Sequence, residues 1–140
     1  MDTLLLEADA WIESADKQKL QGTWNTVSGR REAELLVAGG HFTVKFNNGD
    51  IYLGTFTLDP TQEPHAIDMV ICEGPERHRG KTSLGIYELS IDRFLWSPGD
   101  PGTGERPADF PPVTDKEHLC LVFEREKHGP APAPRAGVNL

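Results

Sequence analysis

The chain has 140 residues, a length that fits one domain with a core of its own. Hydrophobic residues make up 37% of the chain and charged residues 26%, which is typical of a soluble globular protein and excludes a wholly disordered one. The formal net charge of −8 argues against nonspecific binding to nucleic acid or to anionic membranes, because such binding needs clustered Lys and Arg side chains.

The first segment, residues 1–20, predicts one amphipathic helix. Its apolar residues recur at helical spacing and share one face, made of Leu4, Leu5, Ala8, Trp11, Ile12 and Ala15. We expect this face to pack against the rest of the fold, and a homodimer interface is the alternative. No run of about 18 apolar residues occurs, and no basic segment precedes an apolar one at the amino terminus. We therefore expect neither a membrane span nor a secretory signal, and we expect a cytoplasmic protein.

The second segment, residues 21–127, is rich in β-forming residues. Short apolar runs are separated there by Gly, Pro, Asn and Asp. They predict eight strands, at residues 22–29, 32–37, 41–46, 51–58, 66–72, 81–89, 93–97 and 117–126. The strongest hairpin signal is Asn47-Asn48-Gly49-Asp50, because Asn and Gly tolerate the positive φ of a type I′ turn.

Side chains alternate between apolar and polar along these runs. Phe42, Val44 and Phe46 fall on one face of their strand. Sequential strands joined by short turns favour an antiparallel meander, and eight of them favour closure into a barrel, which removes exposed sheet edges. The predicted fold is an all-β, eight-stranded antiparallel barrel with one N-terminal helix. Its interior is either filled by side chains or holds one small ligand.

Two segments predict irregular structure. Residues 97–114 form a long loop rich in Gly and Pro, and loops of this length are often functional. We expect this loop to lie at one mouth of the barrel. Residues 128–140 are rich in Pro and Ala, and they predict a flexible extended tail outside the fold.

Three groups of residues carry a resemblance to a known family. They are Leu20-Gln21-Gly22-Thr23-Trp24 near the start, residues 54–60, 66–68 and 85–89 in the middle, and Glu105-Arg106-Pro107 with residues 121–125 near the end. In this order they resemble an uncharacterised domain family that is abundant in planctomycetes and whose members are similar to lipocalin-like, or calycin, β-barrels. The resemblance covers residues 20–126. Ser97 stands where members of the family often carry a cysteine.

The resemblance implies a structural role for two residues. In lipocalin-like barrels a Trp on the first strand closes the bottom of the barrel, and an Arg from the last strand lies across its ring as a cation–π pair. Trp24 and Arg125 occupy these places, and Gly22 leaves room for the chain that crosses below. We expect this pair to stabilise the barrel rather than to form a site.

No cofactor or metal site is predicted. The five His residues show no H-x-x-x-H spacing, and the two cysteines, Cys72 and Cys120, form no C-x-x-C pair. Each cysteine lies in an apolar run, so we expect buried, reduced thiols. The glycines of the long loop lack the Lys of a phosphate-binding loop, and no Gly-x-Ser-x-Gly motif of serine hydrolases occurs.

Three polar residues could carry chemistry. Asp68 lies between Ile67 and Met69, and it would be a buried carboxylate in need of a partner if its face were the interior. Arg106 is the candidate partner, either in a salt bridge that holds the long loop over the barrel or in a catalytic site. Tyr87 could donate a hydrogen bond to a ligand, or it could be a core aromatic residue that bonds the backbone.

The architecture favours binding of a small, mostly apolar molecule, by analogy with other barrels. The candidate lining residues are Phe42, Val44, Phe56, Met69, Tyr87 and Trp96, with Arg106 at the mouth. One alternative is an enzyme of the isomerase or cyclase type that uses Asp68, Tyr87 and Arg106. The other is a protein-interaction module with a filled core.

Overall fold

The computed structural model describes residues 15–126. Residues 15–20 are helical, and eight strands follow in this part of the chain. The strands are β1 (Gly22–Ser28), β2 (Ala33–Ala38), β3 (His41–Phe46), β4 (Ile51–Asp59), β5 (His65–Glu73), β6 (Thr82–Leu89), β7 (Arg93–Ser97) and β8 (Leu121–Arg125).

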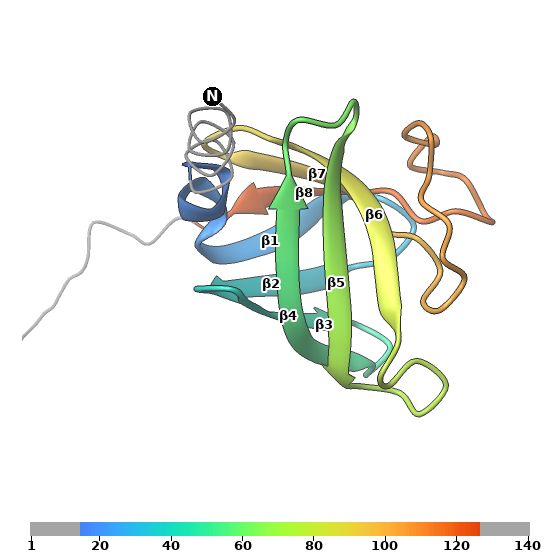
Figure 1. Cartoon of the computed structure of the whole chain (residues 1–140). Coiled ribbons are helices and arrows are strands. Elements are labelled where there is room, and N and C mark those ends of the chain that lie inside the picture. Colours follow the sequence, from blue (N-terminus) through green and yellow to red (C-terminus); the bar gives the residue numbers. More distant parts are fainter. Residues whose placement is uncertain (1–14, 127–140) are drawn as a thin grey trace, which may run out of the picture.

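The strands close into a single antiparallel barrel. Each strand pairs with the next one along the chain, and β8 returns to pair with β1 through Trp24 opposite Arg125 (Figure 1). Every strand therefore has two neighbours, and no sheet edge is left open. This confirms the predicted all-β, eight-stranded antiparallel barrel with a short N-terminal helix.

Seven strands lie within one residue of their predicted ends, but the last begins later than predicted. The prediction placed its start at Glu117, whereas β8 begins at Leu121. The side chain of Asp115 explains the difference, because its Oδ1 accepts hydrogen bonds from the backbone N–H groups of Glu117 and His118, both at 2.8 Å. These bonds turn the chain locally and keep it out of the sheet.

Parts of the predicted organisation lie outside the described residues. The predicted helix over residues 1–20 is described only for residues 15–20, so its apolar face and the predicted homodimer interface stay predictions. The tail, residues 128–140, also lies outside. Within residues 15–126 no helix is long and apolar enough to cross a bilayer.

The hairpin at Asn47 to Asp50 forms where it was predicted, with a positive φ at Gly49. Gly49 has a φ of 99°, a backbone conformation that side chains with a Cβ rarely adopt. The N–H of Phe46 donates to the carbonyl of Asp50 at 2.8 Å, and the N–H of Asp50 donates to Oδ1 of Asn48 at 2.9 Å. The turn joins β3 to β4 and sets their register, in which Val44 lies opposite Tyr52.

Inward-facing side chains fill one end of the barrel. Trp24, Tyr87, Phe94 and Phe123 are each at most 1% exposed. Their rings pack in a chain, with centroids 6.0 Å apart between Trp24 and Phe94 and 5.9 Å apart between Phe94 and Phe123. Leu20, from the end of the helix, is buried in the same core. This end of the barrel is a packed core.

Trp24 and Arg125 hold the filled end together. The Arg125 guanidinium lies 4.2 Å from the centroid of the Trp24 ring, and the indole N–H donates to the carbonyl of Leu20 at 2.8 Å. Arg125 also donates to the backbone carbonyls of Lys19, Gln21 and Ile91. A Cβ on Gly22 would lie 3.1 Å from the guanidinium, so the glycine leaves room for Arg125.

The two cysteines are free and differ in exposure. Cys120 is buried, as predicted, and burial raises the pKa of its thiol. Cys72 is exposed, so the prediction of a buried thiol was wrong there. The prediction failed because apolar residues occur on both faces of β5. Cys72 lies on the outer face together with Val70, which is 41% exposed.

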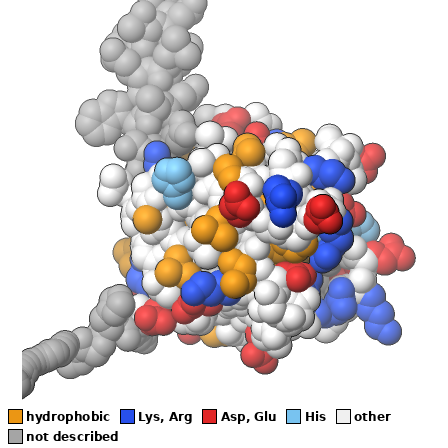
Figure 2. Space-filling view, turned by 90° about the horizontal axis from the view of Figure 1, so that it is seen from below, with side chains coloured by type: hydrophobic (Ala, Val, Ile, Leu, Met, Phe, Trp, Pro, Cys, Tyr) orange, Lys and Arg blue, Asp and Glu red, His pale blue; other side chains and the backbone are white. Residues whose placement is uncertain are grey.

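The outer surface mixes apolar and charged side chains. Ile51 and Leu53 on β4 and Val70 on β5 are exposed large hydrophobic residues. Figure 2 shows hydrophobic side chains gathered between Lys, Arg, Asp and Glu on one face of the molecule. Hydrophobic residues interspersed with charges in this way are ordinary on protein surfaces.

Candidate ligand-binding site

A cavity of about 210 Å³ opens at one end of the barrel. It is larger than the roughly 150 Å³ apolar cavity that accommodates benzene in an engineered protein. The lining residues are Arg30, Arg31, Phe42, Val44, Phe46, Tyr52, Met69, Ile71, His78, Ser83, Trp96, Pro98, Gly99, Asp100, Pro101, Glu117 and Leu119. In Figure 1 the helix lies at the upper left, and the loop between β5 and β6, which carries His78, lies at the bottom.

The inward positions of two strands, β3 and β5, form the apolar wall of the cavity. Phe42, Val44 and Phe46 alternate along β3, and Met69 and Ile71 alternate along β5. All five side chains are at most 9% exposed. Because their strands are held in register by the neighbouring hairpins, the wall is preformed by the fold.

A small residue opposite Met69 contributes to the free volume of the cavity. Met69 pairs with Ser83 on β6, where a larger side chain would project into the barrel. The Ser83 hydroxyl donates to the carbonyl of Gly99 at 2.7 Å and is buried. This bond ties the start of the long loop to the wall, so Gly99 and its neighbours bound the mouth of the cavity.

Tyr52 and His78 form a polar pair at the mouth. Tyr52 Oη lies 2.8 Å from Nδ1 of His78, and the two rings stack with centroids 5.7 Å apart. Burial lowers the pKa of His78, and the nearby charges of Arg77 and Lys81 lower it further. Burial raises the pKa of Tyr52. The imidazole is therefore neutral near pH 7, and in the tautomer with an unprotonated Nδ1 it accepts a hydrogen bond from the Tyr52 hydroxyl.

This pair predicts a pH dependence of stability. The pKa of His78 lies below its ordinary value of 6.5 in the folded state, so between the two values the unfolded chain binds more protons. The free energy of unfolding should fall as the pH drops below 6.5 through the folded pKa. NMR titration of the His78 ring should give a midpoint below 6.5, and His78→Gln should flatten the pH dependence. An unchanged slope in the variant would contradict this assignment.

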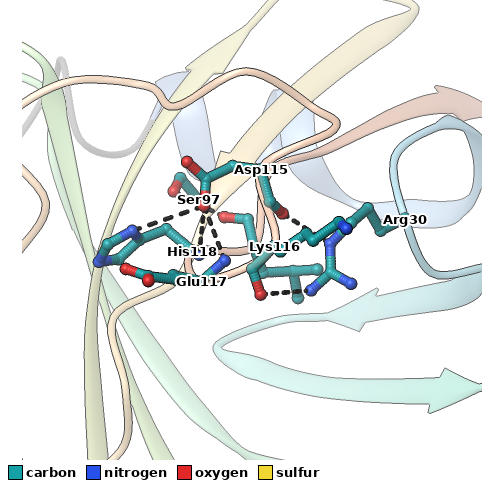
Figure 3. A network of polar contacts seen from close by, with 7 residues as sticks. Arg30, Ser97, Asp115, Lys116, Glu117 and His118 are labelled. Atoms are coloured by element: carbon teal, nitrogen blue, oxygen red, sulfur yellow. Dashed lines mark hydrogen bonds and ion pairs between the residues drawn. The ribbon is translucent and has the colours of Figure 1, made fainter.

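Two arginines from the β1–β2 connection stand at the same mouth. The Arg31 guanidinium lies over the Phe46 ring, 4.3 Å from its centroid. Arg30 donates from Nε to the carbonyl of Asp115 at 2.6 Å and from a terminal nitrogen to the carbonyl of Lys116 at 3.0 Å (Figure 3). Arg30 thus fastens the chain before β8 across the rim.

The segment that Arg30 holds is residues 115–119, named here the rim strap. Its far end is tied to β7, because the buried Ser97 hydroxyl donates to the carbonyl of Leu119 at 2.8 Å. Within the strap, Asp115 accepts the two backbone hydrogen bonds that Figure 3 shows, and these lower the pKa of its carboxyl group. Two residues of the strap, Glu117 and Leu119, line the cavity.

Four of the predicted lining residues meet at this cavity: Phe42, Val44, Met69 and Trp96. The other two aromatic candidates, Phe56 and Tyr87, lie in the buried core but do not line it. Tyr87 donates its hydroxyl proton to Oδ2 of Asp16, from the helix, at 2.7 Å. Nδ1 of His65 lies 4.0 Å from the same oxygen.

Asp68 and Arg106 lie on the outside of the barrel, where they form the salt bridge that was one of the two predicted alternatives. Asp68 is 42% exposed at its side chain and lies on the outer face of β5, so it is not an interior carboxylate. Arg106 is not at the mouth. It pairs with Asp68 at 2.7 Å and donates to the carbonyl of Gly85 at 2.8 Å, so it fastens the long loop against the outer wall.

The polar residues of the mouth were not among the predicted site residues. The alternation along β4 places Tyr52 inward, and its position near the start of the strand could have marked it as a mouth residue. Arg30, Arg31 and His78 lie in connections between strands, where no periodic pattern shows which way a side chain points.

One polar atom at the cavity wall has no partner. The Nε1–H of Trp96 is buried and donates no hydrogen bond within residues 15–126, and the side chain, which is 5% exposed, lines the cavity. Across the same residues, no group of three His, Cys, Asp or Glu side chains is arranged to hold a metal ion.

Comparison of the chain with known protein families, with curated proteins and with solved structures finds no match. The eight-stranded antiparallel closed barrel is compatible with a calycin-like fold.

Proposed function

We propose that the protein binds a small, mostly apolar molecule in the cavity at the open end of the barrel. The observation that carries the proposal is the cavity itself, about 210 Å³, with an aromatic and aliphatic wall. Polar groups stand at its mouth, among them Tyr52, His78 and Arg31. Apolar walls with a few placed polar groups are the usual composition of small-molecule sites.

A relationship to lipocalin-like barrels is part of this proposal, as is membership of the planctomycete-type family. The closed barrel supports it, and so does the contact between Trp24 and Arg125, which join the first strand to the last at the filled end. We also propose that the protein acts in the cytoplasm.

An acid–base enzyme built on Asp68, Tyr87 and Arg106 has less support. Asp68 lies on the outer face of the wall and is engaged by Arg106, whereas Tyr87 is fully buried inside and engaged by Asp16. The sheet separates the carboxylate from the hydroxyl, so one substrate cannot meet both groups.

The test is ligand retention and dye binding by the full chain. Native mass spectrometry of the purified protein should show a retained small molecule, and the naphthalene dye prodan should fluoresce more strongly with the protein than in buffer. Val44→Phe replaces a small aliphatic side chain of the wall with a larger aromatic one that occupies part of the cavity, and it should abolish the dye signal. Val44 is 1% exposed and lines the cavity.

Val27→Phe is the matched control, because it makes the same change at an exposed position of β1 that is 53% accessible. It should leave dye binding unchanged. Absence of both a retained molecule and a dye signal in the wild-type protein would overturn the proposal, and so would equal dye binding by the folded Val44→Phe protein.

A further inference from the structure

Trp96 presents a buried hydrogen-bond donor that nothing in residues 15–126 satisfies. Leaving a donor buried without a partner costs about 1–3 kcal/mol, and native structures rarely keep such a group without a reason. The other buried polar side chain at this wall, Ser83, already donates to the carbonyl of Gly99. Trp96 is therefore the donor in the wall that remains available.

The other polar groups that line the cavity also favour a ligand that carries a hydrogen-bond acceptor. The Tyr52 hydroxyl is engaged with His78, and the Arg31 guanidinium at the rim can only donate. Two carboxylates, Asp100 and Glu117, also line the cavity, but both are exposed. Among the described side chains of the buried wall, Trp96 thus keeps the uncommitted donor, because the hydroxyls of Ser83 and Tyr52 are bonded to Gly99 and His78 and the acidic groups stay in water.

From this arrangement we infer that the ligand is a compact cyclic molecule that carries a carbonyl oxygen, and that this oxygen accepts the hydrogen bond of the Trp96 indole. The inference rests on the proposed binding function and specifies its ligand class. The cavity volume sets the size at one or two fused rings. A hydrocarbon of the same shape leaves the donor unsatisfied, and an alkyl amine, which is protonated at neutral pH, brings only further donors to it.

The indole nitrogen is covered by neighbouring atoms. The inference therefore requires the Trp96 side chain to turn so that its indole nitrogen faces the cavity that the ring lines. The partner strands fix the backbone of this residue, with Trp96 opposite Tyr87 on one side and Leu121 on the other. The movement is consequently limited to the side chain.

Three probes of one shape test the inference: indane, 1-indanone and 1-aminoindane. We expect 1-indanone to bind the full chain about tenfold more tightly than indane, as one satisfied buried hydrogen bond provides, and 1-aminoindane to bind most weakly. Trp96→Phe should bring the affinity for 1-indanone down to that for indane, and the ratio of the two affinities in the variant is the readout. Titrations are followed by NMR chemical shifts of the protein.

A second measurement needs no variant. The chain has three tryptophans, Trp11, Trp24 and Trp96, so its indole N–H region is simple. One indole N–H resonance should move downfield with 1-indanone and not with indane. Equal affinities for indane and 1-indanone, or no indole shift, would overturn the inference and leave the proposed function standing. If none of the three probes binds, the inference is overturned as well, and the proposed function is then decided by ligand retention and dye binding.

Discussion

Replacing Gly54 with alanine is expected to destabilise the barrel by about 3 kcal/mol or more, because it overpacks a site with no room. A Cβ at this position would lie 1.8 Å from the backbone oxygen of Val70 and 3.0 Å from a ring carbon of Phe42. Val70 belongs to the paired strand β5, so its carbonyl cannot move without disturbing the β4–β5 ladder. Urea unfolding followed by circular dichroism measures the loss.

Gly40→Ala is the matched control for this prediction. The nearest atom to a Cβ there is Nζ of Lys17 at 3.5 Å, the end of a flexible side chain. The control should unfold within about 0.5 kcal/mol of the wild-type protein. Equal unfolding midpoints for Gly54→Ala and Gly40→Ala would show that the close approach of β4 and β5 is not needed for stability.

Trp24→Ala is expected to cost about 3–5 kcal/mol, the usual range for removing a large buried ring. Trp24 is fully buried, packs against Phe94 and bonds the carbonyl of Leu20. The substitution therefore opens a hole where the first and last strands meet. Thermal and urea unfolding provide the measurement, and Val27→Ala on the same strand, at an exposed position, should change stability by no more than about 0.5 kcal/mol.

Arg125→Met completes the comparison, because methionine keeps much of the length of the side chain and loses its charge and its donors. A double-mutant cycle between Trp24→Ala and Arg125→Met should reveal a coupling of about 0.5–3 kcal/mol, as for residues in direct contact. Strictly additive losses would mean that the guanidinium contributes only through the backbone carbonyls that it bonds, and not through the ring.

The strand pattern was predictable because each strand has a local signature. The alternation of Phe42, Val44 and Phe46, together with the turn at Gly49, defines β3 and its hairpin without reference to the rest of the chain. Closure followed from the number of sequential strands. The late start of β8 was not predictable from periodicity, because a side chain, Asp115, redirects the backbone just before the strand.

The faces of β5 show why site prediction was harder. Ile67, Met69 and Ile71 alternate with Ala66, Val70 and Cys72, so both faces read as apolar, and the sequence pattern does not tell which one is inside. That ambiguity decides whether Asp68 is an interior acid or an outer-wall partner of Arg106. Its resolution needs the pairing with β4 and β6, which is a property of the whole sheet.

The site residues that lie in connections between strands could not be predicted for a similar reason. Arg31 and His78 come from connections distant in sequence and meet at one mouth only because the barrel closes. The course of the long loop is set by single contacts, such as Arg106 with the carbonyl of Gly85 and Ser83 with that of Gly99. Contacts of this kind leave no periodic trace in a sequence.

The rim strap has a consequence for the rates at which a ligand would bind and dissociate. It is held by Arg30 at one end and Ser97 at the other, and neither bond belongs to the sheet ladder. The entrance could therefore loosen while all eight strands stay paired. Association and dissociation rates would then both rise when these two tethers are weakened.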